Sequence, residues 1–208
     1  MKKSIISKIV FVILIIILII AISIAVTHKE KDFTVKMYDK ICQNENYTFS
    51  MIEENMDMNY TLSVSKKGSD MSIDSKSDND HTTTLIKDET AFYVMHEEKE
   101  YYQYEGNQID ADIIKNGLSG ISEKSYESGH EKINGKNYYY EEYDDISAFF
   151  IMTKYDEQNE IKTRFYFDNG KISYIKTISG EDEELLKIDF SDNVDENSFE
   201  IPDDYAEL

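Results

Sequence analysis

The sequence predicts a mainly β (α+β) protein, in which a single N-terminal transmembrane helix precedes a curved antiparallel sheet of half-barrel type with a leading helix and a lid helix. Three observations predict the span, the strands and the single domain, and the half-barrel form of the sheet is implied by a resemblance in the C-terminal third. An uncharged, isoleucine-rich run covers residues 9–26, several later segments alternate apolar and polar residues, and proline occurs only once. The run is long enough to cross a bilayer as a helix, the alternation is typical of half-buried strands, and the scarcity of breakers indicates one domain.

The apolar run sets the predicted domain organisation. Lysines precede it, so we expect residues 1–8 in the cytoplasm, 9–26 in the membrane as a signal anchor, and 27–208 outside the cytoplasm. This predicts a single-pass cell-membrane protein on a bacterial surface or facing a periplasm. The alternative is a cleaved signal peptide, for which Ser23-Ile24-Ala25 offers small residues. The run exceeds the usual h-region of about 7 to 15 residues, which favours an uncleaved anchor.

The composition excludes several partners. The formal net charge is −20, so nucleic acid is a poor partner. The single cysteine, Cys42, has no partner for an intrachain disulfide. We expect it to be a small buried hydrophobe, and the domain to be held by its core.

The predicted elements follow in chain order. Phe33, Met37 and Ile41 recur at helical spacing and predict the leading helix over 32–43. From Met58 to Ser65 the period changes to two, which predicts a strand with one buried face. Similar strand patterns occur at 47–52, 71–73, 82–86, 91–95 and 101–104.

Two Asn-Gly pairs predict tight hairpins, because both residues tolerate the positive φ angles of a type I′ turn. They are Asn134-Gly135 and Asn169-Gly170. Counting outwards from the second pair places Phe167 opposite Ile172 and Phe165 opposite Tyr174. Between the strand regions, apolar residues a turn apart predict a lid helix over 109–118.

The C-terminal third carries a resemblance to a known family. The segments that carry it are 155–157, 163–172, 188–190 and 201–202, which read YDE, TRFYFDNGKI, IDF and IP. They are similar to the LolA-like lipoprotein-carrier superfamily, which includes LppX-like and LprG-like lipid-binding lipoproteins. The resemblance implies a leading helix before a curved antiparallel sheet whose concave apolar side is covered by helices. Many relatives have an acylated cysteine where this chain has an apolar run, and no cargo-contacting residue can be matched.

This architecture predicts a membrane-anchored extracytoplasmic binding protein that captures a lipid or another hydrophobic ligand in the concave face of the sheet. The expected lining is Leu62, Val64, Ile73, Tyr93, Met95, Phe165 and Phe167, with Ile113 and Ile114 on the lid. The same residues would also serve as an ordinary core. The alternative function is an envelope protein-interaction or scaffold module with a filled core and an exposed aromatic patch such as 138–143.

No enzymatic signature is present, so we predict a non-enzyme without cofactor. The four histidines are scattered without zinc-binding spacing, and no metal site is predicted. The segment 189–200 resembles a calcium loop in its oxygen-bearing side chains, but Val194 stands where the sharp turn needs glycine. We therefore read it as an acidic surface loop. The expected partners are the membrane, a hydrophobic ligand or envelope proteins.

Overall fold

The computed structural model describes residues 32–53, 59–88, 90–105, 117–144, 146 and 160–208. The chain divides into two compact units, Met1–Phe33 and Thr34–Leu208. Nearly all of the first unit lies outside the described residues, including the predicted span 9–26. The same holds for positions 109–116 of the predicted lid helix. Every described strand belongs to the second unit.

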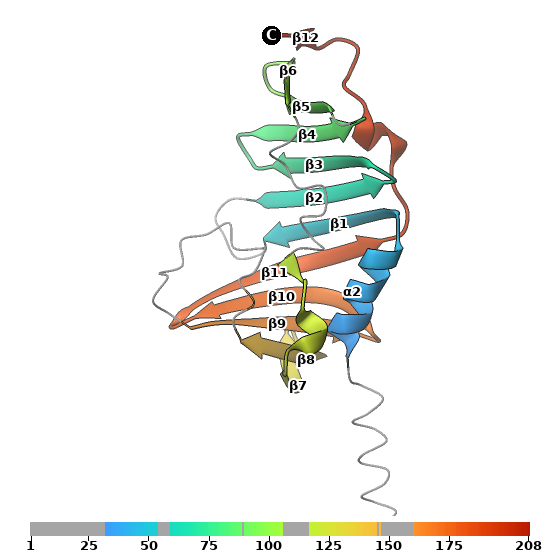
Figure 1. The fold of residues 1–208 in the computed structure, drawn as a ribbon. Helices are drawn as coiled ribbons and strands as arrows, with labels where there is room; N and C mark the ends of the chain where they lie inside the picture. Colours follow the sequence, from blue (N-terminus) through green and yellow to red (C-terminus); the bar gives the residue numbers. More distant parts are fainter. Residues whose placement is uncertain (1–31, 54–58, 89, 106–116, 145, 147–159) are drawn as a thin grey trace, which may run out of the picture. The chain divides into compact units, whose positions relative to one another are not determined.

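The second unit is built on a twelve-stranded sheet in the order β12-β6-β5-β4-β3-β2-β1-β11-β10-β9-β8-β7 (Figure 1). All neighbouring strands are antiparallel except β12 and β6, which are parallel. The strands are β1 (Asn46–Glu53), β2 (Tyr60–Lys67), β3 (Asp70–Lys76), β4 (His81–Lys87), β5 (Thr90–Met95), β6 (Glu100–Glu105), β7 (Glu127–Ile133), β8 (Lys136–Asp144), β9 (Ile161–Asp168), β10 (Lys171–Ser179), β11 (Asp182–Ser191) and β12 (Ala206–Glu207). The helical elements are α2 (Phe33–Gln43) and the short 3-10 turns η2 (Ile121–Glu123) and η3 (Glu196–Phe199).

The sheet is open, with β12 and β7 at its edges. Across the described ranges, no helix has the length and apolar character needed to cross a bilayer. This finding stands against the predicted transmembrane helix, the single-pass topology and the cell-membrane localisation, which we do not retain.

The sheet has two faces of different chemistry. We call the side that includes Phe49, Val64 and Phe165 the helix face, because α2 contacts it through a hydrogen bond from Thr34 to Glu141. It carries most of the buried apolar side chains. Buried members include Tyr47, Phe49, Met51, Val64, Met71, Ile86, Ala91, Phe165, Ile175 and Ile188. The opposite side, with Ser63, Asp74, Thr83 and Arg164, is the polar face.

The leading segment forms α2, with Thr34, Met37 and Ile41 buried. Cys42 is exposed on this helix, so the prediction that it is buried was wrong. It lies next to Ile41 and therefore turns away from the stripe that packs on the sheet.

The β9–β10 hairpin follows its turn residues but not the predicted register throughout. Asn169 and Gly170 both have positive φ, 50° and 80°, and Phe167 lies opposite Ile172 as expected. A register shift between Ile172 and Tyr174 then places Phe165 opposite Ile175. One extra residue in β10 reverses the sides on which the following side chains lie, so Ile175 points towards the helix face. This explains why an apolar residue occurs where the predicted register expects a side chain on the polar face.

Candidate functional site

A hollow of about 720 Å³ lies on the polar face over β1–β5. Its floor consists largely of small hydroxyl side chains, among them Thr48, Ser63, Ser65, Ser72 and Thr83. Successive side chains of a strand point to opposite sides of the sheet, and the pairing of the strands places these residues on the same side. Because serine and threonine are short, the chain that crosses above them does not close the space.

The chain that crosses above the hollow is the C-terminal segment 192–208, which we call the strap. Asn193, Asn197 and Glu200 of the strap line the hollow. The Thr48 hydroxyl donates a hydrogen bond to the Asn193 carbonyl at 3.1 Å. The Lys87 ammonium donates to the Phe199 carbonyl at 3.2 Å.

Charge pairs and a buried ring also hold the strap. Asp192 pairs with Lys40 at 2.8 Å, and Glu196 pairs with Lys67. Phe199 is buried. The acidic residues of this segment therefore fasten the strap to the domain, in keeping with an acidic surface loop.

Two histidines meet at one end of the hollow. His81 starts β4, His96 directly follows β5, and the His96 amide donates to the His81 carbonyl at 3.0 Å. Their rings stack with centroids 3.9 Å apart. His81 Nε2 lies 2.8 Å from Asp74 Oδ1, and His96 Nε2 lies 2.8 Å from the Thr83 hydroxyl. The hairpin register thus brings together two imidazoles that are distant in sequence.

Hydrogen bonding fixes the proton positions in this cluster. The Asp74 carboxylate only accepts, and the Thr83 hydroxyl donates to it at 2.7 Å. His96 Nε2–H must then donate to Thr83, which leaves His96 Nδ1 to accept from the Tyr205 hydroxyl at 2.9 Å. Burial and the neighbouring His81 lower the pKa of His96. Both effects favour the neutral form of the His96 imidazole.

The cluster places one ligating atom each of Asp74, His81 and His96 within 4.8 Å of one another. Sequence reasoning missed it because neither histidine belongs to a spacing motif. The signal that would have found it is the register of the β4–β5 hairpin. Pairing Thr82 with Met95 necessarily brings His81 beside His96.

The predicted hydrophobic lining lies elsewhere. Its seven described residues are all on the helix face, and none of them lines the hollow. Val64, Phe165 and Phe167 are buried, whereas Leu62, Ile73, Tyr93 and Met95 are half-buried. Ile113 and Ile114 lie outside the described residues. The sheet therefore brings the seven to one face but not to the hollow.

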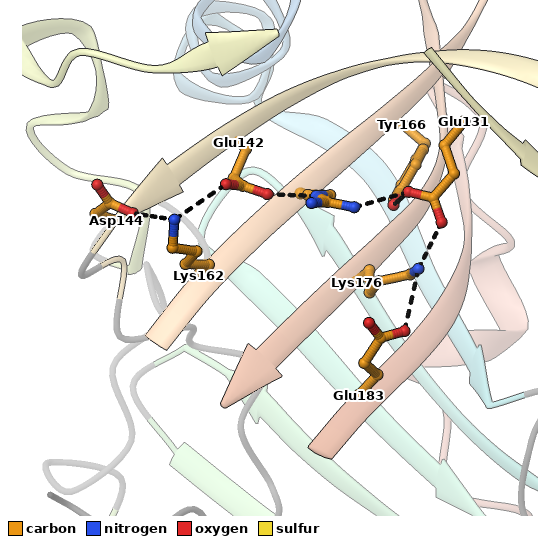
Figure 2. Close-up of polar contacts among 8 residues, drawn as sticks. Glu131, Glu142, Asp144, Lys162, Tyr166, Lys176 and Glu183 are labelled. Carbon is orange, nitrogen blue, oxygen red and sulfur yellow. Dashed lines mark hydrogen bonds and ion pairs between the residues drawn. The ribbon is translucent and has the colours of Figure 1, made fainter. Parts of the chain in front are cut away.

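A second polar cluster occupies the other end of the polar face, on β7–β11 (Figure 2). Glu131 accepts hydrogen bonds from Lys176 at 2.7 Å, Arg164 at 2.8 Å and the Tyr166 hydroxyl at 2.6 Å. Burial raises the pKa of Glu131, but the hydrogen bonds from Lys176 and Tyr166 outweigh this effect and lower it.

Glu142 is buried within the same cluster. Its carboxylate pairs with Arg164 and, at 3.4 Å, with Lys162. The oxygens of Glu131 and Glu142 are thus both paired with cations of neighbouring strands. This arrangement ties the strands together and leaves little charge for a ligand.

Comparisons with known proteins identify no family. No family model and no curated protein matches the chain. Among solved structures, an uncharacterized conserved protein from Thermus thermophilus is similar, with a TM-score of 0.48 and 7% identity over 84% of this chain and 96% of that chain. These comparisons do not test the LolA-like resemblance, which stays a prediction.

Proposed function

We propose that the domain is a binding protein that holds a small polar molecule in the hollow between β1–β5 and the strap. The observation that carries this proposal is the hollow itself, whose volume of about 720 Å³ falls in the range of small-molecule sites. Its size, its position under a fastened strap and the hydrogen-bonding groups in its walls support a ligand-binding role.

The walls indicate the chemistry of the ligand. Hydroxyl groups of Ser63 and Ser65 both donate and accept, and the amide of Asn197 does the same. Leu85 and Val94, together with the carbon atoms of the other side chains, add apolar surface. Such walls suit a small molecule that has several hydrogen-bonding groups and also some apolar surface.

Ligand binding is tested by thermal unfolding of the full chain with sets of amino acids, small sugars, nucleosides and organic acids. We expect one class to raise the midpoint temperature in a concentration-dependent manner. Ser63→Phe narrows the hollow and should abolish the shift. Ser173→Phe, the same change on β10 away from the hollow, is the matched control. The proposal fails if no class stabilises the chain, or if Ser63→Phe responds like wild type.

A second candidate is the capture of a hydrophobic ligand on the helix face. It is supported by the partial exposure of Leu62, Ile73, Tyr93 and Met95, which all lie on that face. A fluorescent fatty acid is the probe, and Leu62→Asp should weaken its binding while Ser63→Phe should not. Unchanged binding in Leu62→Asp, or no binding at all, contradicts this candidate.

The alternative of a protein-interaction module has less support. It requires exposed aromatic residues on the 138–143 strand, but Tyr138 and Tyr143 are buried. Tyr139 and Tyr140 are half-buried, and Tyr140 packs beside Tyr166 with ring centroids 5.7 Å apart. No observation on this strand favours a partner surface.

A further inference from the structure

We propose that Asp74, His81 and His96 form a binding site for a divalent transition-metal ion, with Zn²⁺ the best suited. Two imidazole nitrogens and one carboxylate oxygen are a donor set that Zn²⁺ and related ions prefer. The three ligating atoms lie within 4.8 Å of one another at one end of the hollow. The inference deepens the proposed binding function but does not depend on the identity of the organic ligand.

The backbone holds the three side chains in place before any ion binds. Asp74, on β3, lies opposite Thr83 on β4, and the amide of His96 is bonded to the carbonyl of His81. Metal–nitrogen bonds of about 2.0–2.1 Å bring ligating atoms to about 3.3 Å from one another. The two imidazole rings are stacked, so both side chains must rotate before their in-plane lone pairs can meet at one ion.

The present hydrogen bonds show that these groups already face one another. His81 Nε2 is directed at Asp74 Oδ1, at 2.8 Å. The Thr83 hydroxyl bridges Asp74 and His96 Nε2. An ion replaces the protons that now join these groups, and Thr83 becomes a neighbour of the ligands.

Tyr205 supplies the hydrogen bond that a metal-bound histidine makes through its other ring nitrogen. Its hydroxyl lies 2.9 Å from His96 Nδ1, which leaves Nε2 of that ring for the ion. When Nε2 binds the metal, the ring proton lies on Nδ1. This N–H then donates a hydrogen bond to the Tyr205 hydroxyl oxygen. A hydrogen bond of this kind orients the ring and strengthens the ligand. Since Tyr205 belongs to the strap, the site also joins the strap to the sheet.

Three protein ligands leave a position open towards the hollow. Lys76 also lines the hollow, and its positive charge repels a metal ion nearby. The attraction of the three ligands for the ion must exceed this repulsion. An ion with two neutral imidazoles and one carboxylate keeps a net positive charge. In the proposed binding function, this position takes an oxygen of the organic ligand.

The test uses chelator-stripped full-length chain and Zn²⁺ alone, with binding followed by equilibrium dialysis and metal analysis. We expect one tight equivalent, and Co²⁺ should give the absorption spectrum of a tetrahedral site. His81→Gln and His96→Gln should each weaken binding by more than about 100-fold. Tyr205→Phe should weaken it by about 10-fold, as outer contacts do. His130→Gln on β7 is the matched control and should bind like wild type.

The outcomes separate this proposal from the proposed function. Loss of the tight equivalent in His81→Gln and His96→Gln, with unfolding midpoints near wild type, supports the metal site. Absence of a stoichiometric site, or equal binding by these variants and His130→Gln, overturns it. Organic ligand binding that Ser63→Phe abolishes while Zn²⁺ is not bound leaves the hollow a ligand site and refutes the metal. Zn²⁺ binding without any organic ligand leaves the metal site and refutes the polar-ligand proposal.

Discussion

The buried carboxylate of Glu141 accepts two hydrogen bonds from Thr34, a residue 107 positions earlier in the chain. The backbone N–H donates at 2.9 Å and the side-chain hydroxyl at 2.6 Å. The amides of a first helical turn have no partner inside their helix, and a negative charge beside them is favourable. This contact therefore fixes the start of α2 on β8.

Removing the Thr34 hydroxyl tests the contact. Thr34→Val keeps the shape of the side chain but leaves the Glu141 carboxylate with one hydrogen bond fewer in a buried position. We expect a loss of about 1–3 kcal/mol in the free energy of unfolding, measured by urea denaturation. Thr61→Val, on the more exposed part of β2, is the control and should lie near wild type. Equal stability of the two variants would contradict the role of the contact.

The Glu131 cluster predicts a stability that depends on pH. Because the pKa of Glu131 is lowered in the folded state, its ionised form stabilises the fold above its ordinary pKa of about 4.3. This contribution is lost as pH falls through the lower pKa of the folded state. Wild type should therefore exceed Glu131→Gln most clearly near pH 6, and the difference should shrink as the pH falls below about 4. Denaturant unfolding across this range gives the measurement.

A control at an exposed turn separates this cluster from general acidity. Glu181 lies in the turn between β10 and β11 and is exposed. Glu181→Gln removes the same charge without removing these ion pairs. If the stability difference between Glu181→Gln and wild type changes with pH as that of Glu131→Gln does, the cluster is not the cause of the pH dependence.

Gly129 predicts a steric limit in the same region. A Cβ built on Gly129 would lie 2.7 Å from the Tyr140 hydroxyl, closer than packed atoms allow. The Tyr140 ring lies under the Arg164 guanidinium, 4.7 Å from its centroid, and beside Tyr166. Gly129→Ala must displace this ring, and we expect a loss of about 1–3 kcal/mol in unfolding free energy.

The double variant Gly129→Ala/Tyr140→Leu provides the check on that prediction. With the aromatic ring removed, the added methyl group has room. The alanine should then cost much less than in the wild-type background, as a double-mutant cycle in urea would measure. An equal cost in both backgrounds would show that the ring is not what requires glycine.

The local part of this fold could be predicted from the sequence. Asn169-Gly170 predicted its turn correctly because positive φ depends on the residues themselves. The register beyond Ile172 was not predictable from the turn, since a bulge depends on which side chains the rest of the sheet buries. The half-barrel form was expected from the family resemblance, because alternation predicts which side of a strand is buried and not how the sheet curves.

The candidate site was hidden for a similar reason. His81 and His96 become neighbours only through strand pairing, and Tyr205 joins them from the far end of the chain. Selecting apolar residues led to the helix face, where Phe165 and Val64 serve as core. The hollow is formed by serine and threonine, whose small size matters only once the strap lies above them.

The strap itself gives the last prediction. Phe199 is its buried anchor, and its carbonyl accepts from Lys87. Phe199→Ala removes a buried ring, a change that costs about 3–5 kcal/mol in most cores. If the strap opens separately from the sheet, the Ala206 and Leu208 amides, which donate to Lys99 and Tyr101, should exchange hydrogen faster. Amides at the centre of β9 and β10 should keep their protection.

Lys67→Ala is the control for this experiment. It removes an exposed ion pair to Glu196 and leaves Phe199 in place, so exchange at Ala206 and Leu208 should change little. Zn²⁺ added to Phe199→Ala should slow the exchange again if Tyr205 supports a metal-bound His96, because the ion would favour the closed strap. Uniformly faster exchange across β9, β10 and the strap would show instead that the strap unfolds only with the whole domain.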